Sequence, residues 1–371
     1  MKFHLFMLPT AGTRDQLVQG MVGQRADAYR RTLDDIGRIA RFADDAGYAG
    51  LGFTEHHFHI EGFEVSTNPI LLDLFVAMQT RRLGVGQLGI VLPAASPLRV
   101  AEDIAILDQI SGGRAYAGFA RGYQQRWVNT LAQHIHVGAT RSDKTEMDAL
   151  NRAAFEEALE IIRLAWTRET FRYEGRFWTI PPPDTAWPMP ATKAWGRGVD
   201  GEDRLVEIGI VPRPVQQPHP KIYGPFAFSM STVRYWAKVG GIPVLLSGDL
   251  DFCRGLFTEY REEAARHGRS LRWGESIALG GFFAMASAAS EAQRQADGYR
   301  WAHEAWFTPF GFPKGLELVG DPDGVSAQLE TLHRALAFDE VFLWINQGLS
   351  EVGEVLAGLD LFATRVMPRF A

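Results

Sequence analysis

Apolar and polar residues follow two alternating patterns along the chain. Short, almost continuous apolar segments are typical of strands buried on both faces, and they alternate with longer segments in which apolar residues recur every third or fourth position, as in amphipathic helices. The apolar segments predict eight strands, at residues 3–8, 50–54, 84–92, 115–120, 222–228, 242–247, 277–286 and 340–346. Helical spacing is clearest in four groups: Leu33, Ile36, Ala40 and Ala43; Val100, Ile104 and Leu107; Phe155, Leu159, Ile162 and Trp166; and Val352, Val355, Leu359, Phe362 and Val366.

Strands and helices that alternate in this way predict an α/β fold with a parallel sheet. Eight strands with helices between them, in a chain of 371 residues, favour a (β/α)8 TIM barrel over a doubly wound open sheet. Because 46% of the residues are hydrophobic, the chain can bury a large core. We therefore expect a single domain over residues 1–371.

Two segments are longer than a minimal barrel requires, at residues 9–27 and 168–221. Such long loops in compact enzymes are usually functional or act as covers. The second segment lies between the fourth and fifth predicted strands and is rich in proline, which excludes a long helix. It also carries Trp178, Trp187 and Trp195, so we expect an insertion that packs on the barrel.

Charge and composition narrow the range of partners. The chain has 38 Lys and Arg against 44 Asp and Glu, with no dense basic run, which argues against a nucleic-acid partner. The single cysteine, Cys253, excludes an intrachain disulfide and suits a reducing compartment. The first apolar run ends at Leu8, before Pro9, and the longest uncharged stretch, residues 276–290, is too short to span a membrane. We expect a cytoplasmic protein without a membrane partner.

Candidate catalytic residues follow the second predicted strand, because TIM barrels place catalytic groups at the C-terminal ends of strands. That strand ends in Thr54-Glu55-His56-His57-Phe58. A histidine beside a carboxylate can act as a general acid or base, although a hydrogen-bonded polar rim residue is the alternative interpretation of His56. A metal site made of Glu55, His56, His57 and His59 is disfavoured, because adjacent residues of a strand point to opposite faces.

Two further strand ends could bind a phosphate group. Arg121 and Gly122 follow the fourth strand, and arginine is well shaped to grip a phosphate. The hydroxyl residues Ser229, Ser231 and Thr232 follow the fifth strand at the start of a predicted helix. Hydroxyls in this position are often ordinary N-caps, but a helix start is also a phosphate site, and Arg121 could share the same phosphate. The G-x-G-x-x-G spacing of a nicotinamide dinucleotide site is absent.

Short motifs, dense up to about Tyr123 and sparser afterwards, closely resemble those of the bacterial luciferase α-subunit and its flavin-dependent monooxygenase relatives. They are Glu55-His56-His57-Phe58, Asn68-Pro69, Leu83-Gly84-Val85-Gly86, Ile90-Val91-Leu92-Pro93, Pro97-Leu98-Arg99, Glu102-Asp103, Leu107-Asp108-Gln109, Ser111-Gly112-Gly113-Arg114, Ala120-Arg121-Gly122, Pro214-Val215-Gln216, Pro218-His219-Pro220, Leu361-Phe362 and Val366-Met367-Pro368.

The resemblance implies a TIM barrel that binds reduced FMN non-covalently and oxygenates a small organic substrate with dioxygen, through a flavin C4a-hydroperoxide. It further implies that a separate flavin reductase supplies the reduced FMN, since no second nucleotide site is visible. A homodimer is also expected.

The same resemblance assigns site residues. His56 matches a catalytic acid or base, and Glu55 matches a carboxylate near the flavin ring. Between Leu88 and Gly89 it implies a non-prolyl cis peptide bond beneath that ring. The luciferases have a reactive cysteine at the position of Ala120, which argues against a true luciferase rather than against oxygenation. The residues expected to bind the cofactor are Leu88, Gly89, Ala120, Arg121, Ser229, Ser231 and Thr232, with Arg121 and some of the hydroxyls at the phosphate.

Two other functions are compatible with this barrel. One is a deazaflavin-dependent hydride-transfer oxidoreductase, and the other is a non-catalytic partner subunit like the luciferase β-chain. The Glu55-to-Phe58 motif favours the FMN enzymes, and the presence of His56 and Arg121 together argues against a non-catalytic subunit. Aromatic residues after the strands predict an apolar or aromatic substrate; they are Trp127, Trp178, Trp187, Trp306, Phe307 and Phe310.

Overall fold

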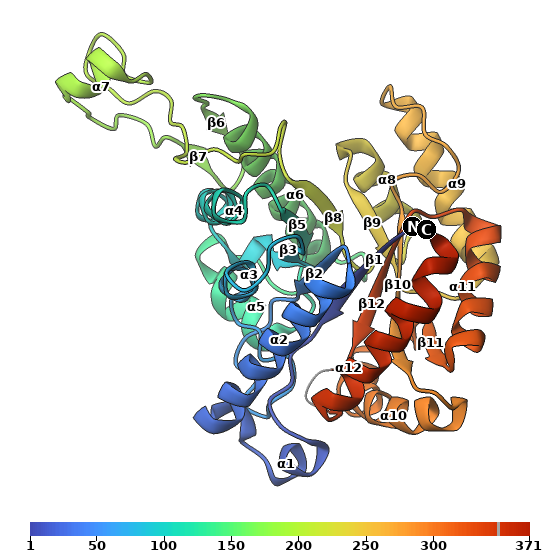
Figure 1. The fold of residues 1–371 in the computed structure, drawn as a ribbon. Helices are drawn as coiled ribbons and strands as arrows, with labels where there is room; N and C mark the ends of the chain where they lie inside the picture. The colour runs from blue at the N-terminus through green and yellow to red at the C-terminus, as the bar shows by residue number, and fades with distance from the viewer. Residues whose placement is uncertain (347–348) are drawn as a thin grey trace. The chain divides into compact units, whose positions relative to one another are not determined.

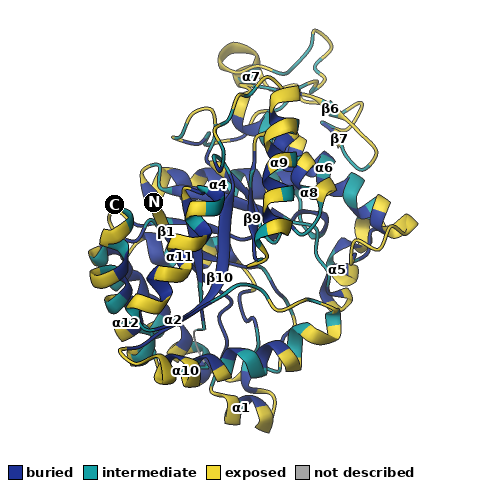
Figure 2. Cartoon of the chain, turned by 90° about the vertical axis from the view of Figure 1, so that its right-hand side faces the viewer, coloured by how far each residue is buried: buried dark blue, intermediate teal, exposed yellow. Residues whose placement is uncertain are grey.

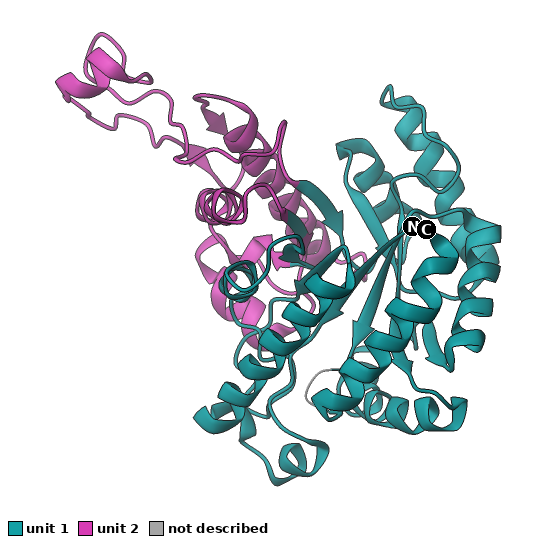
Figure 3. Ribbon diagram, in the orientation of Figure 1, with its two compact units in different colours: residues 1–89, 116–118, 221–371 teal, residues 90–115, 119–220 magenta. Residues whose placement is uncertain are grey.

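The computed structural model describes residues 1–346 and 349–371, and the chain forms two compact units (Figure 3). The first unit comprises residues 1–89, 116–118 and 221–371. The second comprises residues 90–115 and 119–220. The strand β5 (Ala115–Ala120) therefore contributes its three central residues to the first unit and its ends to the second.

The first unit contains a closed barrel of eight parallel strands. Strand order around the barrel is β10-β12-β1-β2-β3-β5-β8-β9, and β9 pairs with β10 to close it. Besides β5, the strands are β1 (Lys2–Met7), β2 (Gly50–Phe53), β3 (Gly84–Gln87), β8 (Lys221–Gly224), β9 (Ile242–Leu245), β10 (Ala278–Met285) and β12 (Glu340–Ile345). The closed parallel barrel confirms the predicted TIM-barrel fold.

Alternation along the strands separates the barrel interior from the outer helices. In β1, Phe6 packs in the interior cluster with Tyr116 and Phe342, whereas Phe3 contacts Phe362 on the helical side at 4.9 Å between ring centroids. This two-residue period is the one expected for a strand buried on both faces. The barrel strands are accordingly buried over most of their length, with Lys2 and Lys221 exposed at strand starts, while the helices expose one face (Figure 2).

Helices of the first unit lie outside the strands, as α2, α11 and α12 illustrate (Figure 1). Helix α12 packs on α2, and α11 packs on α9. The helices of this unit are α1 (Arg14–Gln19), α2 (Ala26–Ala46), α3 (Pro69–Ala77), α8 (Met230–Val239), α9 (Leu250–Arg266), α10 (Ala289–Ala302), α11 (Pro322–Leu336) and α12 (Val352–Leu361).

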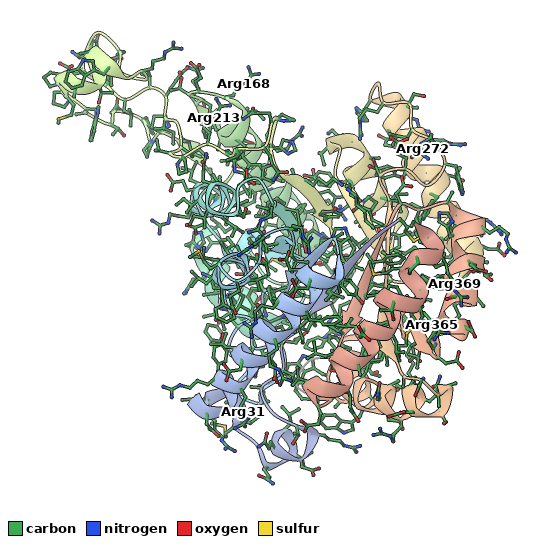
Figure 4. The ribbon with its side chains drawn as sticks, in the orientation of Figure 1. Arg31, Arg168, Arg213, Arg272, Arg365 and Arg369 are labelled. Carbon is green, nitrogen blue, oxygen red and sulfur yellow. The ribbon has the colours of Figure 1, made fainter. Side chains whose placement is uncertain are left out.

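Both α10 and α12 continue into a π-helical turn, at His303–Phe307 and Phe362–Val366. After the second turn, Arg369 forms an ion pair with Asp323 of α11 at 2.6 Å. Arg369 and Arg31 of α2 are both exposed on the surface of the first unit (Figure 4).

Three details differ from the predicted strands. The predicted strand at residues 84–92 is two strands, β3 and the short β4 (Ile90–Val91), separated by Leu88 and Gly89. The predicted strand at 222–228 ends at Gly224, because the chain turns there toward α8. An additional strand, β11 (Glu317–Gly320), extends the sheet beside the end of β10.

The second unit is mainly helical, with α4 (Pro97–Ser111), α5 (Gln125–Leu131) and α6 (Glu146–Thr167). Trp127 and Val128 of α5 are buried in its core together with Ala154 of α6. Trp166 of α6 donates a hydrogen bond to the Ala101 carbonyl of α4 at 3.0 Å. The residues of the apolar faces predicted for α4 and α6 are buried.

The proline-rich segment at residues 168–221 forms a hairpin of β6 (Tyr173–Glu174) and β7 (Thr179–Ile180), followed by the short α7 (Pro190–Trp195). The Glu157 carboxylate of α6 holds the hairpin turn by accepting backbone N–H bonds from Arg176, Phe177 and Trp178 at 2.9 to 3.0 Å. Trp187 is 43% exposed and Trp195 is 88% exposed, so these tryptophans do not supply the packing that the sequence suggested. Packing of the segment on the barrel stays a prediction.

Within the described residues, every helix is too short or too polar to cross a membrane.

Candidate active site

The loop after β2 folds back so that its second half returns beside its first. The His56 N–H donates to the Ser66 carbonyl at 2.8 Å, and the Val65 N–H donates to the Pro9 carbonyl at 2.7 Å. A third backbone bond joins the Ala11 N–H to the Gly62 carbonyl at 2.8 Å. These bonds fix the loop at the C-terminal end of β2, where barrel enzymes place their catalytic groups.

His56 is buried in this loop, and its two ring nitrogens face different partners. The Thr54 hydroxyl lies 3.0 Å from Nδ1, and the Glu64 carboxylate oxygen Oε1 lies 3.4 Å from Nε2. Burial lowers the pKa of His56 well below its usual range, and the charges of His59 and His57 lower it further. The imidazole is therefore uncharged near pH 7 and has a ring nitrogen that can accept a proton.

Glu64 is a buried carboxylate that the sequence reasoning missed. Its backbone lies in the left-handed region, with φ of 47°, which is uncommon for a residue other than glycine. The indole Nε1 of Trp306 donates to Oε2 of Glu64 at 2.7 Å, and the same oxygen lies 3.5 Å from Nδ1 of His59. Phe63 stacks on the Trp306 ring, with centroids 5.0 Å apart.

Glu55, the carboxylate that was predicted beside His56, contacts His57, with 3.1 Å between its Oε1 and the imidazole Nε2. Both side chains are partly buried. Placement of Glu55 beside a flavin ring stays a prediction. Among residues 1–346 and 349–371, no group of three or more His, Cys, Asp or Glu side chains has an arrangement that could hold a metal ion.

The peptide bond between Leu88 and Gly89 is cis, as predicted. Leu88 is buried in the barrel interior, in one cluster with Phe6 and Tyr116. The bond follows β3, directly beyond the hydrogen bond from the Leu88 N–H to the Phe53 carbonyl of β2. The placement of a flavin ring on this bond stays a prediction.

The barrel mouth, meaning the C-terminal ends of the barrel strands, has an aromatic inner surface. Phe226, Phe307 and Trp344 are partly buried and pack on the interior cluster. Phe307 meets Trp344 edge-on with centroids 5.7 Å apart, and Phe226 lies 5.5 Å from Phe6. Phe307 was among the predicted pocket residues, whereas Trp344 was not, because it lies within a predicted strand.

Helix α8 begins beyond the end of β8 with the three predicted hydroxyl residues. Ser229 is the N-cap, and its Oγ accepts the Thr232 N–H at 3.3 Å. The same Oγ lies 3.1 Å from the Ser231 hydroxyl and 2.9 Å from the Thr232 hydroxyl. Ser229 thus has the N-cap role, and the cluster also offers hydroxyl and backbone donors to an anion.

Arg121 lies in the second unit, immediately after Ala120, the last residue of β5. Its guanidinium binds the Asp148 carboxylate at 2.7 Å and also the Ser142 hydroxyl. Burial lowers the pKa of Arg121. The guanidinium keeps its charge near neutral pH, as arginine does in proteins. Because Arg121 and the start of α8 belong to different units, a phosphate shared between them stays a prediction.

A closed parallel barrel with a buried imidazole at the C-terminal end of a strand defines a TIM-barrel protein with its candidate site at the usual rim. More specifically, the chain belongs to the luciferase-like monooxygenase family, whose sequence pattern matches residues 1–338. The resemblance seen in the sequence motifs is thereby confirmed.

Individual relatives give the degree of similarity. The chain is 26% identical over 242 residues to 3,6-diketocamphane 1,6-monooxygenase of Pseudomonas putida, a match that covers 65% of this chain and 60% of that protein. The chain thus spans less than two thirds of that relative's length.

Two solved structures share the fold over the whole chain. Monooxygenase RslO1 from Streptomyces bottropensis has a TM-score of 0.76 and 22% identity, with all of both chains covered. The oxygenating constituent of 3,6-diketocamphane monooxygenase from Pseudomonas putida, a type II Baeyer-Villiger monooxygenase solved in complex with FMN, has a TM-score of 0.76 and 20% identity, covering 100% of this chain and 98% of that one.

Proposed function

We propose that the protein is a monooxygenase that uses reduced FMN and dioxygen to oxygenate a small apolar or aromatic molecule. The observation that carries this proposal is the buried, neutral imidazole of His56 at the C-terminal end of β2, in a chain of the luciferase-like monooxygenase family. The aromatic inner surface of the mouth suits an apolar substrate, because a binding site is usually lined by side chains of matching polarity.

The residues present fit FMN in their chemistry. A phosphate monoester needs several donors and a favourable electrostatic potential, and the start of α8 offers the Ser231 and Thr232 hydroxyls, backbone N–H groups and the positive end of the helix. Arg121 adds a guanidinium that is already fixed by Asp148. When bound, reduced FMN would supply the two electrons with which dioxygen is activated.

The side chains would then bind, shield and move protons. Phe226, Phe307 and Trp344 would exclude water from the mouth, which protects a reactive site from unproductive side reactions. His56 would accept or return a proton at Nδ1, the nitrogen that faces the Thr54 hydroxyl.

Several finer features belong to the same proposal. Reduced FMN would come from a separate flavin reductase, and the protein would act as a homodimer in the cytoplasm. Glu55 would lie near the flavin ring, Leu88 and Gly89 beneath it, and Ala120 beside Arg121. The segment at residues 168–221 would pack on the barrel as a cover.

An anaerobic titration tests the cofactor. We expect reduced FMN to bind tightly and a reduced deazaflavin to bind weakly or not at all. Preferential binding of the deazaflavin would replace this proposal with hydride transfer, and binding of neither would replace it with a non-catalytic subunit.

A turnover experiment tests the reaction. Aldehydes, cyclic ketones and phenols would be supplied with FMN, NADPH and an added flavin reductase, and products would be analysed by mass spectrometry for the gain of one oxygen atom. We expect oxygenated product only when the reductase is present. Equal turnover with NADPH and oxidised FMN alone would contradict the two-component proposal.

A further inference from the structure

We infer that Glu64 is a positioning residue that fixes the tautomer and the ring orientation of His56, and that Trp306 holds Glu64 in place for this purpose. The inference rests on the proposed function, in which His56 moves a proton. It concerns a carboxylate that lies in an irregular loop, and a tryptophan whose position is 242 residues further along the chain.

The two partners of His56 define one tautomer. With Glu64 ionised, its carboxylate carries no hydrogen, and the 3.4 Å separation of Oε1 from Nε2 of His56 favours the imidazole hydrogen on Nε2. A neutral imidazole has a single N–H, and Nδ1 is consequently left as an acceptor for the Thr54 hydroxyl at 3.0 Å. Contacts with Thr54 and Glu64 on opposite sides of the ring also fix its orientation.

Trp306 determines which oxygen of Glu64 is used for His56. The indole N–H is a donor only, and it lies 2.7 Å from Oε2, which leaves Oε1 toward Nε2 of His56. Nδ1 of His59 adds a second contact to Oε2 at 3.5 Å while lying 2.9 Å from the Phe63 carbonyl. The carboxylate is therefore held from one side and presents its other oxygen to His56.

The backbone supports the same assignment. Glu64 has a φ of 47°, and a non-glycine residue keeps such a conformation only where its surroundings impose it. The backbone bonds of the two residues that follow Glu64, from the Val65 N–H to the Pro9 carbonyl and from the His56 N–H to the Ser66 carbonyl, impose it here. Glu64 is thus brought to His56 by the loop and secured there by Trp306.

The substitution Glu64→Gln tests the inference with almost no change in shape. Trp306 still requires an acceptor, so the glutamine oxygen turns toward the indole and its NH2 group turns toward Nε2 of His56. Nε2 must then accept a hydrogen bond, and the single imidazole hydrogen moves to Nδ1. The Thr54 hydroxyl can then no longer donate to Nδ1 and has to accept from it instead. The variant therefore reverses the tautomer.

The tautomer is measured by NMR of protein labelled with nitrogen-15 in its histidines, in which protonated and unprotonated ring nitrogens have distinct shifts. The signals of His56 are assigned by their loss in His56→Gln. We expect hydrogen on Nε2 in the unaltered protein and on Nδ1 in Glu64→Gln. The matched control is Glu157→Gln. Glu157 is another buried carboxylate that binds backbone N–H groups about twenty residues further along the chain, and its substitution should leave the His56 signals unchanged.

Steady-state kinetics give the consequence for turnover. We expect Glu64→Gln to lower kcat about ten- to a hundredfold, the effect that removing a partner which orients a site residue typically has. The KM for the organic substrate and the affinity for reduced FMN should remain unchanged. A lower kcat accompanied by a reversed tautomer supports the inference.

The outcomes separate this inference from the proposed function. Hydrogen on Nδ1 of His56 in the unaltered protein would overturn the inference, and that measurement does not depend on any Glu64 variant folding. An unchanged tautomer or an unchanged kcat in Glu64→Gln would overturn it as well. If the tautomer reverses but the unaltered protein oxygenates nothing, Glu64 keeps its positioning role and the proposed function fails.

Discussion

His56 is the residue on which most of the proposed chemistry depends. We predict that His56→Ala leaves the binding of reduced FMN largely intact but lowers the yield of oxygenated product and increases the release of hydrogen peroxide. The reason is that the variant loses a buried proton acceptor at the strand end while keeping the donors at the start of α8. Product yield and peroxide are measured together in single-turnover experiments.

A matched control for that experiment is His134→Ala, since His134 is an exposed histidine of the second unit. It should behave like the unaltered protein. A yield in His56→Ala equal to that of the control would mean that His56 is only a polar residue of the rim.

Arg121 belongs to the phosphate part of the proposal. We predict that Arg121→Ala weakens the binding of reduced FMN about ten- to a hundredfold, because a charge-assisted hydrogen bond typically contributes roughly 1.5 to 3 kcal/mol. The variant also leaves Asp148 without its ion pair to Arg121, and the matched variant Asp148→Asn shows how much of the loss comes from disturbing that pair. An unchanged dissociation constant in Arg121→Ala would place the phosphate elsewhere.

Sequence reasoning found some of these residues and missed others for physical reasons. His56 was predictable because it follows an apolar strand, and barrel strands deliver their last residues to the rim. Glu64 was not, because no periodicity describes the loop that returns it to His56. Trp306 was predicted as pocket lining, whereas the structure shows its indole bound to a carboxylate.

At the scale of elements, the start of α8 has an N-cap role and a proposed phosphate-binding role, which substitutions can separate. We predict that Ser229→Ala lowers the free energy of unfolding by about 1 kcal/mol, the usual cost of losing an N-cap. Ser229→Asp should keep the cap and the stability, because aspartate is an equally good N-cap. Its negative charge should nevertheless weaken the binding of reduced FMN by repelling the phosphate.

Denaturation in urea and flavin titration measure the two effects on the same samples. If Ser229→Asp binds reduced FMN as well as the unaltered protein does, then the start of α8 is an ordinary helix cap and the phosphate lies elsewhere.

The predicted elements were accurate where the hydrophobic period was long. The helices at Val100 to Leu107 and at Phe155 to Trp166 are present because two or more turns repeat the same apolar face. Strand β11 was missed because its four residues follow a glycine-containing turn and are too few to establish alternation. The interruption at Leu88 was expected only from the family resemblance, since the apolar run itself continues through it.

At the scale of the whole molecule, the barrel interior contains a histidine that makes stability depend on pH. His4 stacks on Phe342 inside the barrel and lies 3.6 Å from Glu340. Burial lowers its pKa to about 4, although the nearby Glu340 raises it. Between pH 6.5 and pH 4 the unfolded chain therefore binds a proton at this position that the folded protein does not.

We predict that this proton lowers the free energy of unfolding as the pH falls through that window, by about 3 kcal/mol in total. The stabilisation is complete above pH 6.5. His4→Gln should flatten the dependence by about one proton, or roughly 1.4 kcal/mol per pH unit. Urea denaturation of both proteins at several pH values measures the two slopes, and parallel curves would show that His4 is protonated in the folded barrel.

The barrel could be predicted from the sequence because each of its strands is a compact apolar run between longer helical segments. What could not be predicted is the division of the chain into two units, in which β5 contributes residues to both. Composition changes only at the proline-rich segment, whereas the second unit already begins at Ile90, within a continuous apolar run.

The π-helical turn His303–Phe307 has a consequence for how this site can change over time. A π-helical turn advances each residue by somewhat less than the roughly 100° of a regular α-helix, and a single deletion before Trp306 would still carry the indole to another side of the helix and away from Glu64. Such a change would keep every other named side chain and still remove the donor. We therefore expect insertions and deletions between Ala302 and Trp306 to be more damaging than most substitutions in this stretch of the chain.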